Sequence, residues 1–278
     1  MDREIAKSVA NSSVLGKAYD DLVHSSAESL GNTISLVPRT IGVWLRGWEK
    51  WVVNGEESVR RTIEAVGKRA DGIPEEHLVE PPAHIAVPAI QQLAYCYDSA
   101  ELREMYAKLL LSTMDDRTAE YVHPSFVQLL KELSPDEAKL LGTLIPTEAD
   151  DRPTIPLIDL RIVSDATGLG SEGLARLFHW RNAVEGYNEC CEGVCEHPER
   201  SLVYLGNLER LGILERCEHY VENDKEKLLA FEASNAVAVA KEKESLKDGE
   251  KFETRRWCYQ VTDFGLNFIK VCVSQTRC

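Results

Sequence analysis

The stretch Ser134-Pro135-Asp136-Glu137 is the sharpest structural signal in the chain. Ser134 is placed to accept a hydrogen bond from the first turn of a helix, and Pro135 suits the first helical position. Glu137 stands at the spacing that closes a capping box. These residues predict a helix that begins here and runs to about Ile145. Because the sequence pattern changes afterwards, we expect a domain boundary near this point.

The residues before Ser134 predict a helical domain. From Leu102 to Met114, apolar side chains recur at the three- and four-residue intervals of an amphipathic helix. The polar run Asp115-Asp116-Arg117 that follows is expected to be a solvated turn. We therefore expect a mostly helical first domain over residues 1–133.

The residues after Ser134 mix strand and helix signals. The expected elements are a strand at Ile155–Val163, helices at Glu172–Tyr187 and Ser201–Leu211, strands at Ile213–Val221 and Trp257–Thr262, and a closing helix at Asp263–Val273. Counted from Ser134, this is the order of a winged-helix domain. The predicted fold class is mainly α, becoming α+β at the C-terminus, with a winged-helix-like domain over residues 134–278.

A charged stretch over residues 222–251 separates the last two expected strands. Its Ala-rich centre, Ala230–Ala240, predicts a helical insert in the wing. Because the charge pattern is that of a solvated segment, we expect that a short linker could replace the insert without loss of solubility.

Composition excludes several classes of protein. The chain has 278 residues, 44% hydrophobic and 28% charged, which suits a folded core. Its net charge of −14 opposes broad binding to nucleic acid or anionic lipid. The first residues lack the apolar run of a secretory signal, and the longest uncharged stretch, Pro81–Tyr97, is too polar and short to span a membrane. Eight cysteines without such a signal predict reduced thiols and a cytoplasmic protein.

Several short motifs occur in a defined order along the chain. They are Val79-Glu80-Pro81-Pro82, Glu101-Leu102-Arg103-Glu104, His123-Pro124-Ser125-Phe126, Leu133–Ala138, Asn207–Gly212 and Thr262–Gly265. In this order and spacing the chain resembles the abortive-infection alpha (Abi-alpha) family of bacterial phage-resistance proteins, from about residue 70 onward. The resemblance implies an antiviral role in phage defence and carries over no catalytic residue.

Three thiols and one imidazole form a candidate metal site. Its members are Cys190, Cys195, His197 and Cys217. Thiolate and imidazole ligands of this kind suit zinc. However, the spacing is not that of two C-x-x-C knuckles, so we expect reduced thiols in or near a loop and no metal or other cofactor.

An enzyme is not expected. His84 and His123 could each act as a general base, but the sequence shows no Ser, Cys or Asp paired with either. The segment from His123 to Ser125 is more typical of a helix start. The chain also lacks phosphate-binding, dinucleotide-binding, serine-hydrolase and zinc-protease motifs.

DNA binding through the winged helix is disfavoured. The third helix of that domain would bring Arg210, with Arg200 just before it, against Glu199 and Glu209. Residues 185–255 hold 17 acidic and 10 basic side chains, a difference of −7. Such a surface repels phosphate, so protein contact is the better use for this domain.

The Trp-rich segment 34–53 is the candidate interaction surface. Its partner- or membrane-binding candidates are Arg39, Trp44, Arg46, Trp48, Lys50 and Trp51. Spacings of four and three residues place the three tryptophans on one helix face. Residues 34–70 hold seven basic and four acidic side chains, a difference of +3 in an acidic chain. Core packing is the competing interpretation of this face.

Together these features predict a non-enzymatic antiphage protein that acts by protein–protein recognition of a phage or host partner. Three alternatives remain open. They are a membrane-perturbing effector that uses residues 34–53 at the inner membrane, a winged-helix nucleic-acid-binding regulator, and an unrecognised hydrolase or nuclease. The sequence also leaves a homo-oligomer open.

Overall fold

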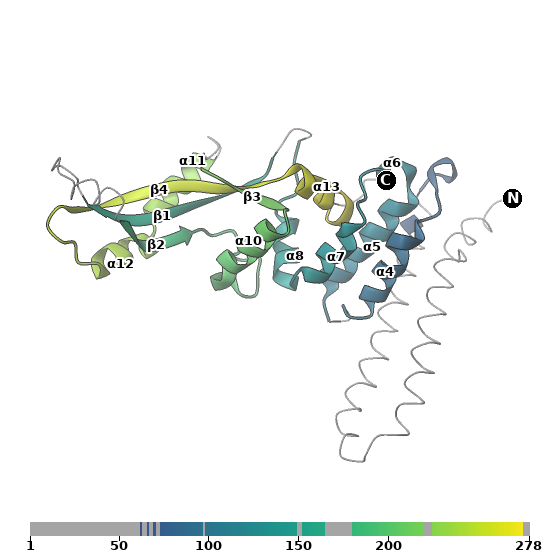
Figure 1. Ribbon diagram of the computed structural model, residues 1–278, viewed down its shortest axis with the longest axis horizontal. Coiled ribbons are helices and arrows are strands. Elements are labelled where there is room, and N and C mark those ends of the chain that lie inside the picture. The colour runs from purple at the N-terminus through teal and green to yellow at the C-terminus, as the bar shows by residue number, and fades with distance from the viewer. Residues whose placement is uncertain are drawn as a thin grey trace, which may run out of the picture. The chain divides into compact units, whose positions relative to one another are not determined.

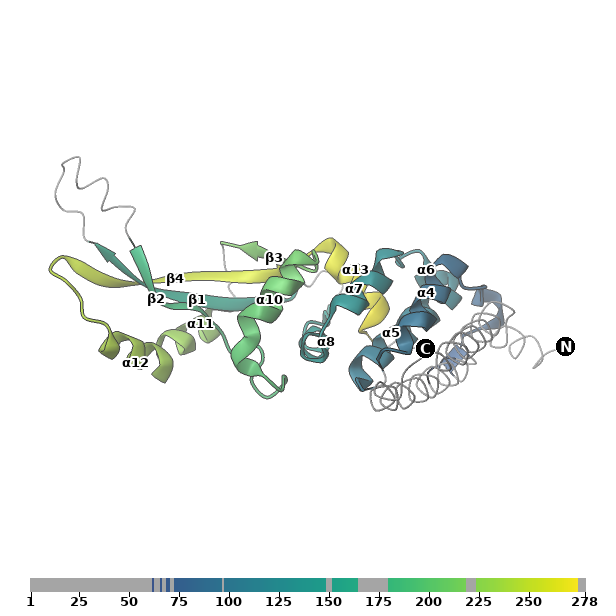
Figure 2. The same cartoon turned by 60° about the horizontal axis from the view of Figure 1, so that its bottom comes forward.

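The structure is a computed structural model that describes residues 73–96, 98–148, 152–164, 180–218 and 224–274, together with Thr62, Val66, Arg69 and Ala70. The chain divides into two compact units (Figures 1 and 2). Unit 1 comprises Met1–Ile145 and Asn267–Cys278, and unit 2 comprises Pro146–Leu266. Each unit is described by itself.

Unit 1 is helical throughout its described part. Its elements are η1 (Glu75–His77), α4 (Ala83–Leu93), α5 (Ala100–Met114), α6 (Asp116–Ala119), α7 (Ser125–Glu132), α8 (Pro135–Gly142) and the last residues of α13 (Asp263–Cys272). The predicted capping box at the start of α8 is confirmed. The Glu137 amide donates to Ser134 Oγ at 3.3 Å, and the Ser134 amide donates to the Glu137 carboxylate at 2.6 Å.

The core of unit 1 forms around α5. Tyr106, Leu109 and Leu110 of this helix are almost fully buried. The ring of Phe126 on α7 packs edge-on against Phe268 of α13, with centroids 5.2 Å apart. This packing brings residues from the chain's end into the same core as residues from its middle.

Unit 2 contains a four-stranded antiparallel sheet. The strands are β1 (Thr154–Ser164), β2 (Trp180–Tyr187), β3 (Leu214–Cys217) and β4 (Glu250–Val261), in the spatial order β2-β1-β4-β3. Strands β1 and β4 pair along their whole lengths, from Thr154 opposite Gln260 to Ser164 opposite Glu250 (Figure 1). The remaining elements in the described part of this unit are η2 (Pro198–Arg200), α10 (Ser201–Arg210), α11 (Lys225–Glu232), α12 (Asn235–Lys243) and the first residues of α13.

The prediction of a mainly α fold with a winged helix is wrong. Of the described residues, 52% are helical and 20% lie in strands, and the sheet has four strands. Within the described part of the expected helix Glu172–Tyr187, residues 180–187 form strand β2. Pairing with β1 overrides the local helical pattern there. The two expected wing strands do pair antiparallel, as β3 and β4, but β4 begins at Glu250 and is paired on both sides.

The insert is not a solvated appendage. Its helices α11 and α12 pack on β1 and β2 (Figures 1 and 2). Leu228, Phe231 and Val237 from these helices form one buried cluster with Ile158 and Leu160 of β1. The expectation that the insert can be deleted therefore conflicts with the structure, because deletion would expose one face of the sheet to water.

No helix in the described ranges is both long enough and apolar enough to cross a membrane.

Candidate functional site

The candidate residues of the Trp-rich segment lie outside the described residues. They are Arg39, Trp44, Arg46, Trp48, Lys50 and Trp51.

The cysteine and histidine candidates are dispersed over a loop and a strand. The Cys190 thiol lies 2.9 Å from Asn188 Oδ1 and 3.7 Å from the Cys191 thiol. His197 faces Glu199 at 3.4 Å, and Cys217 lies 3.7 Å from Gln260 Oε1 on the neighbouring strand. Across the part of the chain that the structure describes, no three His, Cys, Asp or Glu side chains are grouped as a metal would need.

His123 has a partner that sequence reasoning missed. Its Nδ1 lies 2.6 Å from Ser125 Oγ and accepts a hydrogen bond from the Ser125 amide at 3.2 Å. Because an amide can only donate, Nδ1 is the acceptor in this pair. The pair is two residues apart at the exposed start of α7, where it binds the amide of the first helical residue.

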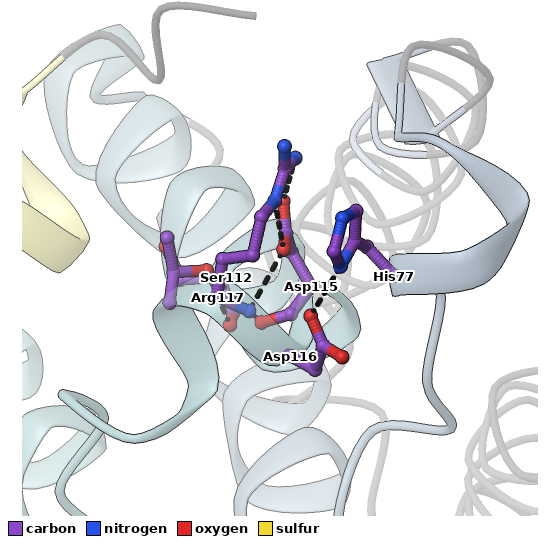
Figure 3. Close-up of polar contacts among 6 residues, drawn as sticks. His77, Ser112, Asp115, Asp116 and Arg117 are labelled. Atoms are coloured by element: carbon purple, nitrogen blue, oxygen red, sulfur yellow. Dashed lines mark hydrogen bonds and ion pairs between the residues drawn. The ribbon is translucent and has the colours of Figure 1, made fainter.

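The corner between α5 and α6 holds a buried carboxylate (Figure 3). Asp115 is 3% exposed, although the sequence predicted a solvated turn. Arg117 Nε donates to Asp115 Oδ1 at 2.9 Å, and its Nη2 donates to Oδ2 at 2.6 Å. The Arg117 amide also donates to Oδ1, at 3.0 Å. The hydrogen bond from Arg117 holds the pKa of the Asp115 carboxyl below its usual range.

The same corner attaches the segment that contains η1. The Val79 amide donates to the Met114 carbonyl at 2.9 Å, and His77 Nδ1 lies 2.9 Å from Asp116 Oδ1 (Figure 3). Leu78 also forms an isolated β-bridge with Asp115, so this segment is paired with the corner. Because both oxygens of Asp115 bind Arg117, the carboxylate serves the local structure.

The sheet of unit 2 presents a second buried carboxylate among arginines and tryptophans. We call this surface the arginine–tryptophan face and define it by Asp159, Arg161, Trp180, Arg216, Arg255 and Trp257. Residues directly opposite or two apart on antiparallel strands share a face. Asp159 stands opposite Arg255, and Leu157 opposite Trp257. Arg216 stands opposite Tyr259, two residues from Trp257. The helices α11 and α12 cover the other face, which carries Ile158 and Leu160.

Asp159 is the centre of this face and is 2% exposed. Its Oδ1 accepts hydrogen bonds from the Gly186 amide at 2.9 Å and from Trp257 Nε1 at 3.0 Å. Its Oδ2 accepts from Arg161 Nη2 at 3.3 Å and lies 3.8 Å from Arg255 Nη1. One carboxylate thus ties together side chains and backbone from β1, β2 and β4.

Two arginines of the face stack on its tryptophans. The Arg161 guanidinium lies 4.2 Å from the ring centroid of Trp180, and that of Arg216 lies 3.8 Å from the centroid of Trp257. Both distances are typical of a cation–π contact. Trp257 is buried, whereas Trp180 is 51% exposed. The face therefore presents an aromatic ring and oriented guanidinium groups to solvent.

The face also contains polar atoms that the fold leaves unsatisfied. Among the described residues, the buried side-chain nitrogen and oxygen atoms without a hydrogen-bond partner are Arg161 Nε and Asn182 Oδ1. Arg161 and Asn182 stand opposite each other on β1 and β2. Such an atom costs about 1–3 kcal/mol of stability. The arrangement is therefore not the one that stability alone would select.

Sequence reasoning did not find this face, although one signal was present. Asp159 and Arg161 interrupt an otherwise apolar strand at a spacing of two residues, which places both on one side of the sheet. Trp180 and Arg216 join them only through the pairing of β1 with β2 and of β3 with β4.

The comparisons with known proteins give one match. The family model described as "Abortive infection alpha" matches residues 54–272. No curated protein and no solved structure shows significant similarity. The matched region includes α4–α8 of unit 1 and the whole sheet of unit 2. Since the match covers most of the chain, the protein belongs to the abortive infection alpha family, which points to a role in phage defence.

Proposed function

We propose that this protein acts in phage defence as a non-enzymatic recognition protein that binds a protein partner through the arginine–tryptophan face. The observation that carries the proposal is the pair of stacked arginines, Arg161 on Trp180 and Arg216 on Trp257, arranged around the buried Asp159.

The composition of the face favours a protein partner. Tryptophan and arginine are enriched among the residues that dominate binding energy at protein interfaces. Stacking on an indole ring restricts a guanidinium before binding, so less side-chain entropy is lost when a partner binds. The half-exposed ring of Trp180 supplies apolar area beside these donors.

The charge of the face indicates what the partner offers. Guanidinium groups prefer carboxylates or phosphates. A nucleic-acid backbone is the less suitable ligand, because the chain carries a net charge of −14 and Glu218 bonds to Arg255 at 2.6 Å on this sheet. A protein segment that places one or two carboxylates beside an apolar side chain fits better. Such a partner could come from the phage or from the host.

The enclosure of Asp115 and Asp159 favours a structural role for these two carboxylates over a catalytic one. Asp115 binds Arg117 through both oxygens, and Asp159 is surrounded by four donor groups and buried. A general acid or base must reach the proton that it transfers in the substrate. Both aspartates are instead enclosed by their partners.

The test is phage protection by variants with an altered face. Cells that express Trp180→Ala or Arg216→Glu should lose at least about tenfold in protection, measured as efficiency of plating, because a central aromatic or arginine contact contributes ~1–2 kcal/mol or more. Tyr95→Ala is the matched control, since Tyr95 is an aromatic residue of unit 1 with 59% exposure. Thermal unfolding checks that all three variants fold. Full protection by both face variants would refute the proposal.

The Trp-rich segment is a second proposed contact surface, for a partner or for the inner membrane. Changing Trp44, Trp48 and Trp51 to Gln removes its aromatic side chains. Loss of protection without loss of fold would assign the segment to binding, whereas a large drop in melting temperature would assign it to the core. Flotation with anionic liposomes separates a membrane from a protein partner.

A further inference from the structure

Two cysteines face each other across the β3–β4 pair. Cys217 and Cys258 are direct partners in the strand register. The Thr262 amide donates to the Ile213 carbonyl at 3.0 Å, which identifies that pair as hydrogen-bonded. Because hydrogen-bonded and non-hydrogen-bonded pairs alternate, Cys217 and Cys258 also form a hydrogen-bonded pair, four residues along each strand.

This placement suits a disulfide. Cα atoms of a hydrogen-bonded antiparallel pair lie ~5.5 Å apart. Disulfides join Cα atoms separated by ~4.4–6.8 Å. Because directly opposite residues on antiparallel strands share a face, both side chains point to the same side of the sheet. The Cβ atoms of such a pair lie ~5–5.5 Å apart, so they must approach by about 1 Å to reach the ~3.5–4.5 Å of a disulfide.

We propose that Cys217 and Cys258 form a reversible disulfide when the protein meets a small-molecule disulfide such as oxidised glutathione. The two thiols differ in their exposure to solvent, and this difference decides which one reacts with the oxidant first. Cys217 is partly exposed on the edge strand β3, whereas Cys258 is buried on β4. The oxidant therefore reaches Cys217 first.

The exchange proceeds in two balanced steps. The Cys217 thiolate attacks one sulfur of oxidised glutathione, so that a mixed disulfide forms and one glutathione thiolate leaves. The sulfur of Cys258 then attacks the Cys217 sulfur, a Cys217–Cys258 bond forms, and the second glutathione leaves and takes up the Cys258 proton. Two electrons pass from the protein dithiol to the glutathione disulfide, and dithiothreitol reverses the change.

Burial keeps Cys258 out of the first step. It raises the pKa of the Cys258 thiol to about 12, so this group stays protonated near neutral pH. A protonated thiol is a poor nucleophile toward a free oxidant. The same thiol can complete the second step because its target sulfur is then held next to it.

The disulfide would act on the edge of the sheet. Strand β3 has four residues and, among the strands that the structure describes, pairs with β4 alone. A covalent bond at its last residue would prevent the end of β3 from separating from β4. This inference does not depend on the proposed function, because it concerns the sheet itself.

The experiment uses the full chain with oxidised glutathione as the probe. After incubation, N-ethylmaleimide blocks free thiols, and peptide mass spectrometry locates the disulfides. We expect a Cys217–Cys258 cross-link that disappears with dithiothreitol. Amide hydrogen exchange in β3 should slow about tenfold in the oxidised protein.

Three variants sharpen the result. Cys258→Ser should trap glutathione on Cys217, and Cys217→Ser should leave Cys258 unmodified in the folded protein. The matched control is Cys190→Ser/Cys191→Ser, which removes the thiol pair at 3.7 Å and should leave the cross-link intact. A wild-type protein that stays glutathionylated at Cys217, or that cross-links other cysteines while Cys217 and Cys258 remain free, would overturn the proposal. The wild-type measurement tests the proposal even if one of the variants fails to fold.

Discussion

Two buried aspartates, one in each unit, show how differently one kind of residue is used. Asp115 and Asp159 are 3% and 2% exposed, and both bind arginine. Asp115 is held by Arg117, two residues away in the chain. Asp159 is held by groups that lie 27 and 98 residues away, in Gly186 and Trp257. The first carboxylate fixes a local corner, whereas the second organises a surface built from distant strands.

The largest expected effect comes from removing the helices that cover the opposite face of the sheet. Replacing residues 224–247 by a short linker should make the protein insoluble, because Ile158 and Leu160 would lose their cover from α11 and α12. Expression followed by a solubility assay measures this. A soluble deletion protein with an unchanged melting temperature would show that the sheet carrying Asp159 is stable by itself.

Removing the Asp159 side chain should lower the unfolding free energy less than deleting the two helices does. It should lower it more than removing the Asp115 side chain. Asp159→Ala leaves the Trp257 indole N–H and the Gly186 amide without their acceptor. Breaking one side of a buried charged network costs ~3–5 kcal/mol. Urea unfolding of the variant and the wild type gives the difference in unfolding free energy. A cost below about 1 kcal/mol would mean that Asp159 does not organise the face.

Asp115→Ala should reduce stability by about 1–2 kcal/mol, as for loss of a helix N-cap. The cost is smaller because Arg117 has a side chain that is 49% exposed, so solvent can hydrate it when its partner is removed. The same urea experiment measures both aspartates. If the two variants lost equal unfolding free energy, Asp115 and Asp159 would not differ in how strongly they hold the fold.

Features formed by residues close together in the chain can be predicted from the sequence, whereas features formed by distant strands cannot. The capping box at Ser134 lies within four residues, so its pattern predicted the α8 start correctly. The Asp115–Arg117 pair is equally short, but its burial depends on the bridge between Leu78 and Asp115, which sequence reasoning missed. The arginine–tryptophan face needs the register of four strands. Local spacing carries no information on that register.

The strand β2 illustrates the same limit. The segment from Trp180 to Tyr187 fits a helical pattern, yet it pairs with β1 along a register that contains irregularities between Ile158 and Arg161. Its structure is decided by a partner strand and not by its own residues.

Acid should weaken the Asp115 contribution in a defined direction. The pKa of this carboxyl is lowered in the folded protein. Its stabilising effect is therefore fully present above the unfolded value of ~3.9 and is lost as the pH falls through the folded value. The melting temperatures of the wild type and Asp115→Asn should differ at neutral pH and converge in strong acid. A constant difference over this range would contradict the assigned role.

The smallest expected effect on stability is that of Trp180→Ala. A side chain that is 51% exposed contributes little to the core, so the unfolding free energy should change by less than about 1 kcal/mol. Urea unfolding measures this change. A loss of several kcal/mol would place Trp180 in the core network instead of on a binding surface.

Phage protection measured side by side for Trp180→Ala and Asp115→Asn tests the central claim most directly. If the arginine–tryptophan face binds the partner, Trp180→Ala should lose protection with a nearly unchanged melting temperature. Asp115→Asn should keep protection although its melting temperature falls. The less stable variant, Asp115→Asn, then protects better than the more stable variant, Trp180→Ala. Full protection by Trp180→Ala at equal expression, or protection that simply follows melting temperature in both variants, would contradict this account.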